Sequence, residues 1–296
     1  MNWPENYSIK DVGYLGYTLL ALLLNVAATL LAVHLGFRAP RRIERKTPAD
    51  SGLAYEEIRI RTTAGKQLFA WWLPVAVPAP TLVILHGWGG NAELMLPLAL
   101  PIYQAGFNTL LLDARNHGRS DSDSYSSLPR FAEDAGAAVD WVKVHGGDPR
   151  KRVALPGHSV GAGAVLLAAS RRDDIAAVIS IAAFAHPAWM MRRYLDRFPV
   201  PAFYKACILR YTEWVIGHRY TEIAPINTVS RVRCPILLVH GAQDETVPVT
   251  DAHAIQNNCS GSNLELLLIE DARHDSVEEI EHYAGRLVAF LERATR

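Results

Sequence analysis

Short apolar runs that alternate with helical patterns constrain the fold of this chain more than any other feature. The runs read TLVILHG, NTLLLDA, RVALPG, IAAVISIAAF, CPILLVHG and NLELLLIE. TLVILHG and NTLLLDA in particular are continuously apolar, which is typical of strands that are buried on both faces. Apolar residues at helical spacing occupy the intervening segments 91–104, 129–144, 160–171 and 249–257, and a last such segment spans 276–293. The alternation predicts an α/β fold with a mostly parallel sheet and helices on both faces.

Two further segments before these runs are typical of a β-hairpin. The sequence YEEIRIRT alternates polar and apolar residues, and LFAWWLP follows it after a turn around Ala64-Gly65. We therefore expect two strands joined as a hairpin.

The loop after one predicted strand carries the sequence GHSVG at residues 157–161. Ligands of parallel sheets bind beyond the carboxyl ends of the strands. A serine between two glycines at a sharp strand-to-helix turn is exposed at the helix N-terminus, where the helix dipole favours negative charge. A plain tight turn can have the same short sequence, so the interpretation of Ser159 depends on residues elsewhere in the chain. We interpret Ser159 as a candidate nucleophile.

A serine nucleophile needs a base, and the chain has eleven histidines. His274 lies in a loop after the last predicted strand and before the final helix, from which it can reach back over the sheet. His158 is next to the serine, but its side chain should leave the turn in another direction. His117 and His186 are weaker candidates near the same edge of the sheet. We predict that His274 is the base.

The base in turn needs an acid that orients its ring. Asp244 follows a predicted strand in the sequence HGAQDETVP, and the adjacent Glu245 is an alternative. Asp271 and Asp275 flank His274 too closely to orient it easily. We predict Asp244, which completes the order Ser, Asp, His that this strand–turn–helix nucleophile has along the chain.

Two backbone N–H groups are candidates for stabilising the negative charge of an acyl-transfer intermediate. One belongs to Val160, directly after the serine. The other belongs to Trp88 in the sequence HGWGGN, where the glycines let the backbone approach a substrate closely. A phosphate-binding loop fits less well, because the sequence lacks the lysine and the spacing of a Walker motif.

These segments together resemble the α/β-hydrolase superfamily over residues 55–293. The similarity lies in HGWGGN, LLLDARNHGRSD, GHSVGAG, HGAQDETVP and the terminal RHD. The resemblance implies the α/β-hydrolase fold, with an eight-stranded sheet whose second strand is antiparallel. It assigns the triad positions to Ser159, Asp244 and His274. It also implies structural roles for three residues of the second motif, Asp113, Arg115 and Ser120.

The predicted function is that of a serine hydrolase, similar to carboxylesterases and lipases, that cleaves carboxylic esters or thioesters through an acyl-enzyme. A serine at position 159 argues against the dehalogenases and epoxide hydrolases of this superfamily, which use an aspartate. The expected substrate is a small-molecule or lipid-derived acyl compound, and no metal or organic cofactor is expected. A serine peptidase acting on short peptides and a non-catalytic ligand-binding protein of the same fold are the alternatives.

An insertion at about 184–233 interrupts the strand–helix rhythm and is rich in aromatic residues. Because it follows a strand at its carboxyl end, we predict a helical lid over the site. The alternative is that its aromatic side chains simply pack on the sheet.

The segment 13–37 has no Asp, Glu, Lys or Arg in 25 residues, and five basic residues follow within 38–46. At about 1.5 Å per residue, such a helix crosses a hydrocarbon core of about 30 Å. A cleaved signal peptide has a basic start and a shorter apolar core, and this segment has neither. We predict a single-pass transmembrane helix in the domain 1–37. The basic residues then place the hydrolase domain, 55–296, in the cytoplasm, after a basic juxtamembrane linker at 38–54.

The charge bears on the partners of the protein, and the cysteine content bears on its compartment. Thirty basic residues balance thirty acidic ones, so the net charge gives no reason to expect nucleic-acid binding. The three cysteines are far apart and odd in number, which favours a reducing compartment over a disulfide framework. The sequence does not indicate an oligomeric state.

Overall fold

The computed structural model describes residues 9–75, 79–146, 148, 152–275 and 283–295. The chain divides into two compact units, Met1–Arg38 and Ala39–Arg296.

The first unit contains the helix α1 (Ile9–Gly36). Its part Tyr14–Gly36 has 23 residues and is long and apolar enough to cross a membrane. The hydroxyls of Thr18 and Thr29 donate to carbonyl oxygens one turn earlier, at 2.8 and 2.9 Å. These bonds satisfy both hydroxyls within the helix, which makes them compatible with an apolar environment.

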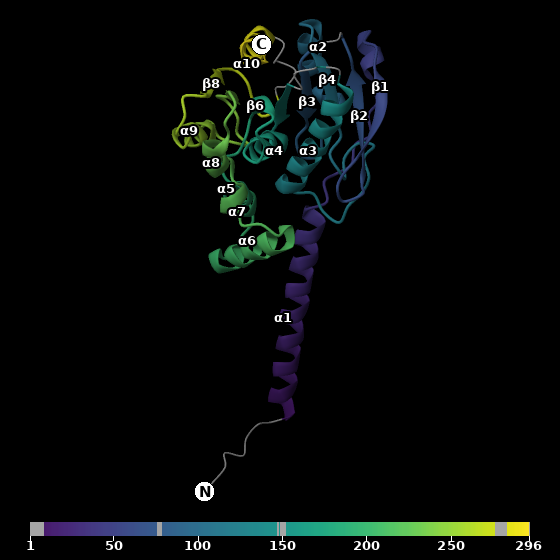
Figure 1. Cartoon of the computed structure of the whole chain (residues 1–296). Coiled ribbons are helices and arrows are strands. Elements are labelled where there is room, and N and C mark those ends of the chain that lie inside the picture. The colour runs from purple at the N-terminus through teal and green to yellow at the C-terminus, as the bar shows by residue number, and fades with distance from the viewer. Residues whose placement is uncertain (1–8, 76–78, 147, 149–151, 276–282, 296) are drawn as a thin grey trace. The chain divides into compact units, whose positions relative to one another are not determined.

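The second unit is built on an eight-stranded sheet (Figure 1) with the order β1-β2-β4-β3-β5-β6-β7-β8. β2 runs antiparallel to both of its neighbours, and all the other pairs are parallel. The predicted α/β-hydrolase sheet with an antiparallel second strand is therefore confirmed. The strands are β1 (Glu56–Arg61), β2 (Gln67–Leu73), β3 (Thr81–Leu85), β4 (Asn108–Leu112), β5 (Val153–His158), β6 (Ile175–Ile181), β7 (Ile236–Gly241) and β8 (Leu264–Ile269).

The helices outside the insertion lie close to where the apolar spacing predicts them. They are α2 (Leu96–Gln104), α3 (Leu128–His145), α4 (Val160–Ala169), α9 (Val249–Asn257) and α10 (Ala284–Thr295), and short 3₁₀ turns span Pro48–Ser51 and Glu93–Met95. For the predicted helix at 276–293, residues 276–282 lie outside the described residues.

The predicted helix at 91–104 begins later than expected. Its first part is a 3₁₀ turn, and the α-helix starts at Leu96. The N–H of Ala92 donates to Asp113 on a neighbouring loop. Pro97 favours the start of a helix at this point, because a first-turn residue needs no N–H donor.

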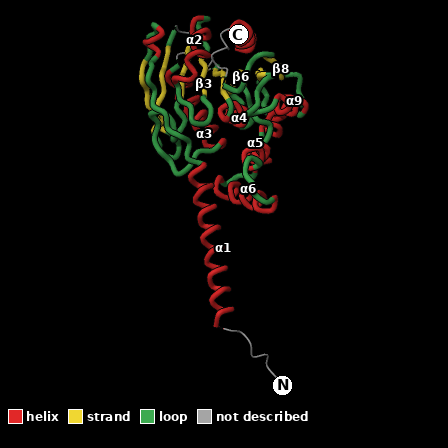
Figure 2. The backbone as a smooth tube through the Cα atoms, turned by 180° about the vertical axis from the view of Figure 1, so that it is seen from behind, coloured by secondary structure: helices red, strands yellow, loops and turns green. Residues whose placement is uncertain are grey.

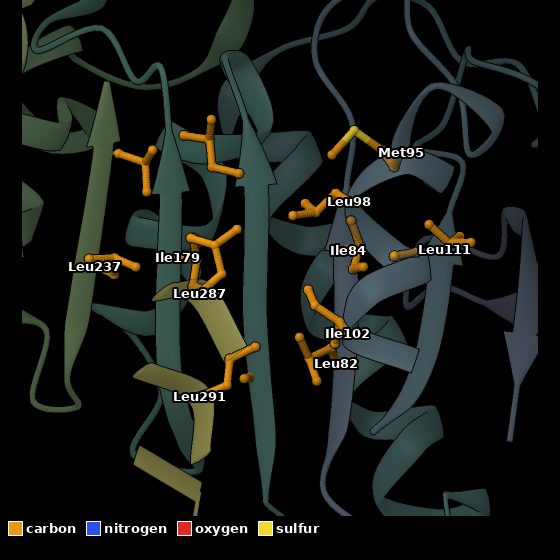
Figure 3. Packing of buried hydrophobic residues seen from close by; sticks show 14 of the residues in the cluster. Leu82, Ile84, Met95, Leu98, Ile102, Leu111, Ile179, Leu237, Leu287 and Leu291 are labelled. Atoms are coloured by element: carbon orange, nitrogen blue, oxygen red, sulfur yellow. The ribbon is translucent and has the colours of Figure 1, made fainter. Parts of the chain in front are cut away.

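Apolar side chains fill both sides of the sheet. On one face, α2 and α10 pack against alternate strand residues (Figure 3), with a core that includes Leu82, Ile84, Leu98, Leu111, Ile179, Leu237, Leu287 and Leu291. On the other face, α3 and α4 pack against each other and against β3 and β5, and Phe131 and Val139 of α3 are fully buried. Seen from behind, the strands lie between these helices (Figure 2). Such burial supplies about 25 cal/mol per Å² of apolar surface and holds the strand ends in place.

The insertion is helical. It forms α5 (Pro187–Leu195), α6 (Ala202–Ile216), α7 (Tyr220–Ile223), α8 (Pro225–Thr228) and a 3₁₀ turn at Val229–Arg231. Phe203 and Trp214 of α6 are 71% and 77% exposed, so its aromatic side chains do not all pack on the sheet. The fully buried Asp251 of α9 fastens the start of the insertion, because it accepts bonds from the N–H of Ala185 and the guanidinium of Arg193.

Candidate active site

The backbone at Ser159 has the strained conformation that a sharp strand-to-helix turn requires. Its φ of 54° and ψ of −116° lie in a region that non-glycine residues rarely adopt. A Cβ on Gly157 would lie 2.5 Å from the carbonyl oxygen of Gly161, and one on Gly161 would overlap that of His86. Both glycines are therefore needed for the chain to reverse here, and Ser159 lies between them at the end of β5.

Three loops place Ser159, His274 and Asp244 in one hydrogen-bonded chain. The Nε2 atom of His274 lies 3.0 Å from Ser159 Oγ, and its Nδ1 atom lies 2.7 Å from Asp244 Oδ2. An ionised carboxylate can only accept, so Nδ1 carries the proton and Nε2 is free to accept the serine hydroxyl proton. Asp244 follows β7 and His274 follows β8. The structure thus brings together the three residues that the sequence singles out.

The surroundings of Asp244 favour its ionised form. Its Oδ1 atom accepts the N–H groups of Thr246 and Val247 at 2.9 and 2.7 Å. Burial by itself would raise the pKa of Asp244, but the bonds from His274 and Val247 hold the pKa below its ordinary value. The carboxylate is therefore charged at neutral pH and can hold the His274 ring in one tautomer. Glu245, the alternative acid, is exposed.

The loop after β3 lies against the serine. A Cβ on Gly87 would be 3.1 Å from the Cβ of Ser159, so the backbone that leads into Trp88 passes directly beside this serine. Val160 is the first residue of α4, where N–H groups have no helical acceptor. In the described part of the chain, neither the Trp88 nor the Val160 N–H donates to a protein acceptor. Both amides are thus available at this edge.

The weaker histidine candidates are occupied elsewhere. The ring of His117 is buried and its Nδ1 atom bonds to the carbonyl oxygen of Arg115 at 3.0 Å. Burial lowers the pKa of His117 to about 4. His186 accepts the N–H of Ala188 at 3.1 Å and thereby caps α5. Neither ring hydrogen-bonds to Ser159.

His158 has a contact that the sequence reasoning missed. Its Nε2 atom donates to the backbone oxygen of His274 at 2.8 Å, and the two rings lie 5.3 Å apart. Burial lowers the pKa of His158 to about 4, so the ring is neutral near pH 7. His158 therefore supports the loop of the candidate base. Its position next to Ser159 was the only signal in the sequence.

One group of side chains at the site has metal-ligand chemistry. The ligand atoms of His158, His274 and Asp275 lie within 4.8 Å of one another. Both ring nitrogens of His274, however, already contact Asp244 and Ser159. A metal would have to displace one of these bonds, so the arrangement fits a proton-transfer triad better than a metal centre.

The motif DARNHGRS, residues 113–120, lies in the loop after β4 and stabilises that loop. Ser120 Oγ accepts the N–H of Phe69 at 2.7 Å and donates to the carbonyl oxygen of Asp113 at 2.6 Å. The buried guanidinium of Arg115 donates to Asp134 at 2.8 Å. These contacts hold the loop after β4 against β2 and α3.

An eight-stranded sheet of this topology, with a serine at the strained turn after β5, defines a serine hydrolase of the α/β-hydrolase fold. A model of the family described as serine aminopeptidase, S33, matches residues 76–224, about half of the chain, and the chain belongs to this family.

Individual proteins that are similar to this chain include an esterase and an α/β-hydrolase domain-containing protein. The esterase Pf2001 of Pyrococcus furiosus has a similar structure, with a TM-score of 0.72 and 25% identity over 88% of this chain and 98% of that one. The Arabidopsis thaliana α/β-hydrolase domain-containing protein WAV2 is 25% identical over 241 residues, which cover 76% of this chain and 73% of the relative. Est1E of Butyrivibrio proteoclasticus, solved with ferulic acid, shares the fold at a TM-score of 0.62 and 22% identity, over 80% of this chain and 98% of that one.

Proposed function

We propose that this protein cleaves carboxylic esters or thioesters through an acyl-enzyme on Ser159. The observation that carries the proposal is the hydrogen-bonded chain from Ser159 through His274 to Asp244, at a turn whose strain exposes the serine. The similarity to the Pyrococcus furiosus esterase supports an ester as the substrate.

The chemistry follows from the tautomer of His274. Its Nε2 atom takes the hydroxyl proton of Ser159 as Oγ bonds to the carbonyl carbon. The N–H groups of Trp88 and Val160 donate to the resulting oxyanion, and the loss of one such donor typically costs about 10²- to 10³-fold in rate. The imidazolium then protonates the leaving alcohol or thiol. Water, deprotonated by the same nitrogen, attacks the acyl carbon. The bond from that carbon to Ser159 Oγ breaks as the imidazolium returns the proton to Oγ, and the acid is released.

Aminopeptidase activity is the second candidate, because the matched family is described as serine aminopeptidase. The same triad can attack an amide, but the leaving amine must be protonated before it departs. An aminopeptidase must in addition recognise the free amino group of its substrate.

A substrate panel distinguishes the two candidates. We expect p-nitrophenyl esters and acyl thioesters of two to sixteen carbons to be cleaved with kcat/KM at least about 100-fold above that for aminoacyl p-nitroanilides. The reason is that an amide has a poorer leaving group and needs an amine subsite. The kcat/KM values of the full chain on both series are the measurement. Preferential cleavage of the anilides would replace the esterase proposal with the aminopeptidase.

We further propose that α1 anchors the protein in a membrane with the hydrolase unit in the cytoplasm. The length and apolar character of Tyr14–Gly36 support an anchor, and the arginines after it support the orientation. The full chain is expected in the membrane fraction after carbonate washing, and a chain lacking residues 1–37 in the supernatant. Protection of the hydrolase unit from protease added to intact cells tests the orientation. Release of the full chain by carbonate, or cleavage from outside, would contradict the proposal.

A further inference from the structure

Residues 39–47, here called the strap, lie across the loop that contains Trp88. A Cβ on Gly89 would be 3.1 Å from Pro40 Cγ, so the two residues are in direct contact. Further along, the backbone oxygen of Arg42 accepts the side-chain amide of Asn91 at 3.3 Å, and the N–H of Arg45 donates to a Glu93 carboxylate oxygen at 2.7 Å. The strap thus follows the loop after β3 from residue 89 to residue 93.

Arg41 joins the strap to the loop after β4. Its guanidinium donates to the carbonyl oxygens of Gly118 and Ser120 at 2.9 and 2.7 Å, and to Ser122 Oγ at 3.0 Å. Three bonds from one planar guanidinium fix both the position and the orientation of that loop. The strap is therefore bound to two of the loops at the candidate active site.

The side chain of Glu44 closes the junction between these segments. Asp113 accepts the N–H of Ala92 through Oδ1 and the N–H of Arg119 through Oδ2, both at 2.8 Å. A Cβ on Gly118 would overlap the carboxyl groups of both Asp113 and Glu44, which places these two groups next to each other.

A shared proton explains how two carboxyl groups can lie so close. Both carboxylate oxygens of Glu44 are buried, and no donor in the described residues reaches them. Burial, followed by the adjoining Glu44 carboxyl, raises the pKa of Asp113 well above its ordinary value. A proton held between the two groups would give each a hydrogen bond and connect the strap to both loops.

We propose that the strap positions the Trp88 amide for the developing oxyanion, and that Arg41 and Glu44 are positioning residues for the reaction. The inference rests on the proposed serine-hydrolase mechanism. The loop is held from the sheet side by His86, whose Nδ1 atom donates to the oxygen of Gly87 at 2.7 Å and whose Nε2 atom accepts the N–H of Ala114 at 3.1 Å. The strap holds the same loop through its contacts with Gly89, Asn91 and Glu93.

Loss of the strap contacts should weaken the stabilisation of the transition state. The Trp88 N–H meets full negative charge only after Ser159 has attacked, so a displaced loop weakens that state more than substrate binding. A misplacement of about 1 Å can cost about 100-fold in rate.

The experiment compares full-chain variants on one p-nitrophenyl ester. Arg41→Ala is expected to lower kcat about 10- to 100-fold with KM within about twofold. Arg45→Ala is the matched control, because it removes the same charge from the strap, and in the described residues the Arg45 side chain makes no hydrogen bond or ion pair. It should change kcat less than about twofold.

Glu44 supplies a second, independent pair of variants. Glu44→Gln should keep kcat within about threefold, because an amide N–H can replace the shared proton. Glu44→Ala should lower kcat about tenfold or more, since it removes the carboxyl group that lies beside Asp113.

An inhibitor separates positioning from a general loss of structure. A trifluoromethyl ketone adds to Ser159 Oγ and forms an oxyanion, so its inhibition constant should rise in Arg41→Ala by the same factor as kcat/KM falls. The corresponding secondary alcohol forms no oxyanion and should bind equally to both proteins. Equal kcat in Arg41→Ala and Arg45→Ala, or equal weakening of ketone and alcohol, would overturn the strap proposal. Ester cleavage that persists in Ser159→Ala would instead overturn the proposed function.

Discussion

Replacing Ser159 with alanine is expected to lower kcat for ester cleavage by about 10⁶-fold, the largest effect of any single substitution in this chain. The variant keeps the turn geometry and the oxyanion donors, but it has no oxygen with which to form an acyl-enzyme. The His274 nitrogen that lies 3.0 Å from Ser159 Oγ then has no proton to accept. Steady-state kinetics on the best ester measure the loss.

Covalent labelling gives the same prediction a second readout. A fluorophosphonate probe should label the wild-type protein and fail to label Ser159→Ala. Ser170→Ala is the matched control, because Ser170 is the C-cap of the same helix and its hydroxyl donates to the carbonyl oxygen of Leu167, away from Ser159. That variant should keep full labelling and activity. Equal labelling of the wild type and Ser159→Ala would show that the nucleophile lies elsewhere.

Replacing Asp244 with asparagine is expected to lower kcat by about 10⁴-fold. An amide can donate to His274 Nδ1 and so stabilise the tautomer that carries its proton on Nε2. That nitrogen can then no longer accept the proton of Ser159. The short bond of 2.7 Å between His274 and Asp244, together with the lowered pKa of Asp244, makes the effect large.

Glu245→Gln is the control for this substitution, because it makes the same chemical change one residue further on. Glu245 is exposed, whereas Asp244 is buried and accepts two backbone N–H groups. The control should retain kcat within about twofold. If the two variants lost activity equally, or if Asp244→Asn lost less than tenfold, Asp244 would not be the orienting acid.

Much of the fold was predictable, because its signals are local. Continuous apolar runs predicted the strands β3 to β8, and the apolar spacing at 249–257 predicted α9 with the bounds that the structure shows. The late start of α2 was not predictable from spacing alone. Spacing ignores Pro97, which lacks an N–H and therefore favours a helix that begins just before it.

Some contacts of the candidate site were likewise predictable from the sequence, and others were not. Ser159 was identifiable because the two glycines around it meet a steric demand of the turn itself. His274 and Asp244 were identifiable because parallel strands bring the loops after β7 and β8 to one edge of the sheet. The support that His158 gives to His274 was not identifiable, since its direction depends on how residues 158 and 274 approach in the folded chain.

The sequence alone determined the order of strands and helices along the chain, the turn at Ser159 and an apolar segment long enough for a membrane. Periodicity, glycine sterics and segment length each act over a few neighbouring residues. Only the tertiary structure decided the contacts of residues 39–47. In the sequence they are a basic stretch that suggested a linker, yet Arg41 bonds to residues 118–122 and Glu44 lies beside Asp113. Hydrogen bonds across about eighty positions depend on how the loops meet, and no local pattern encodes that.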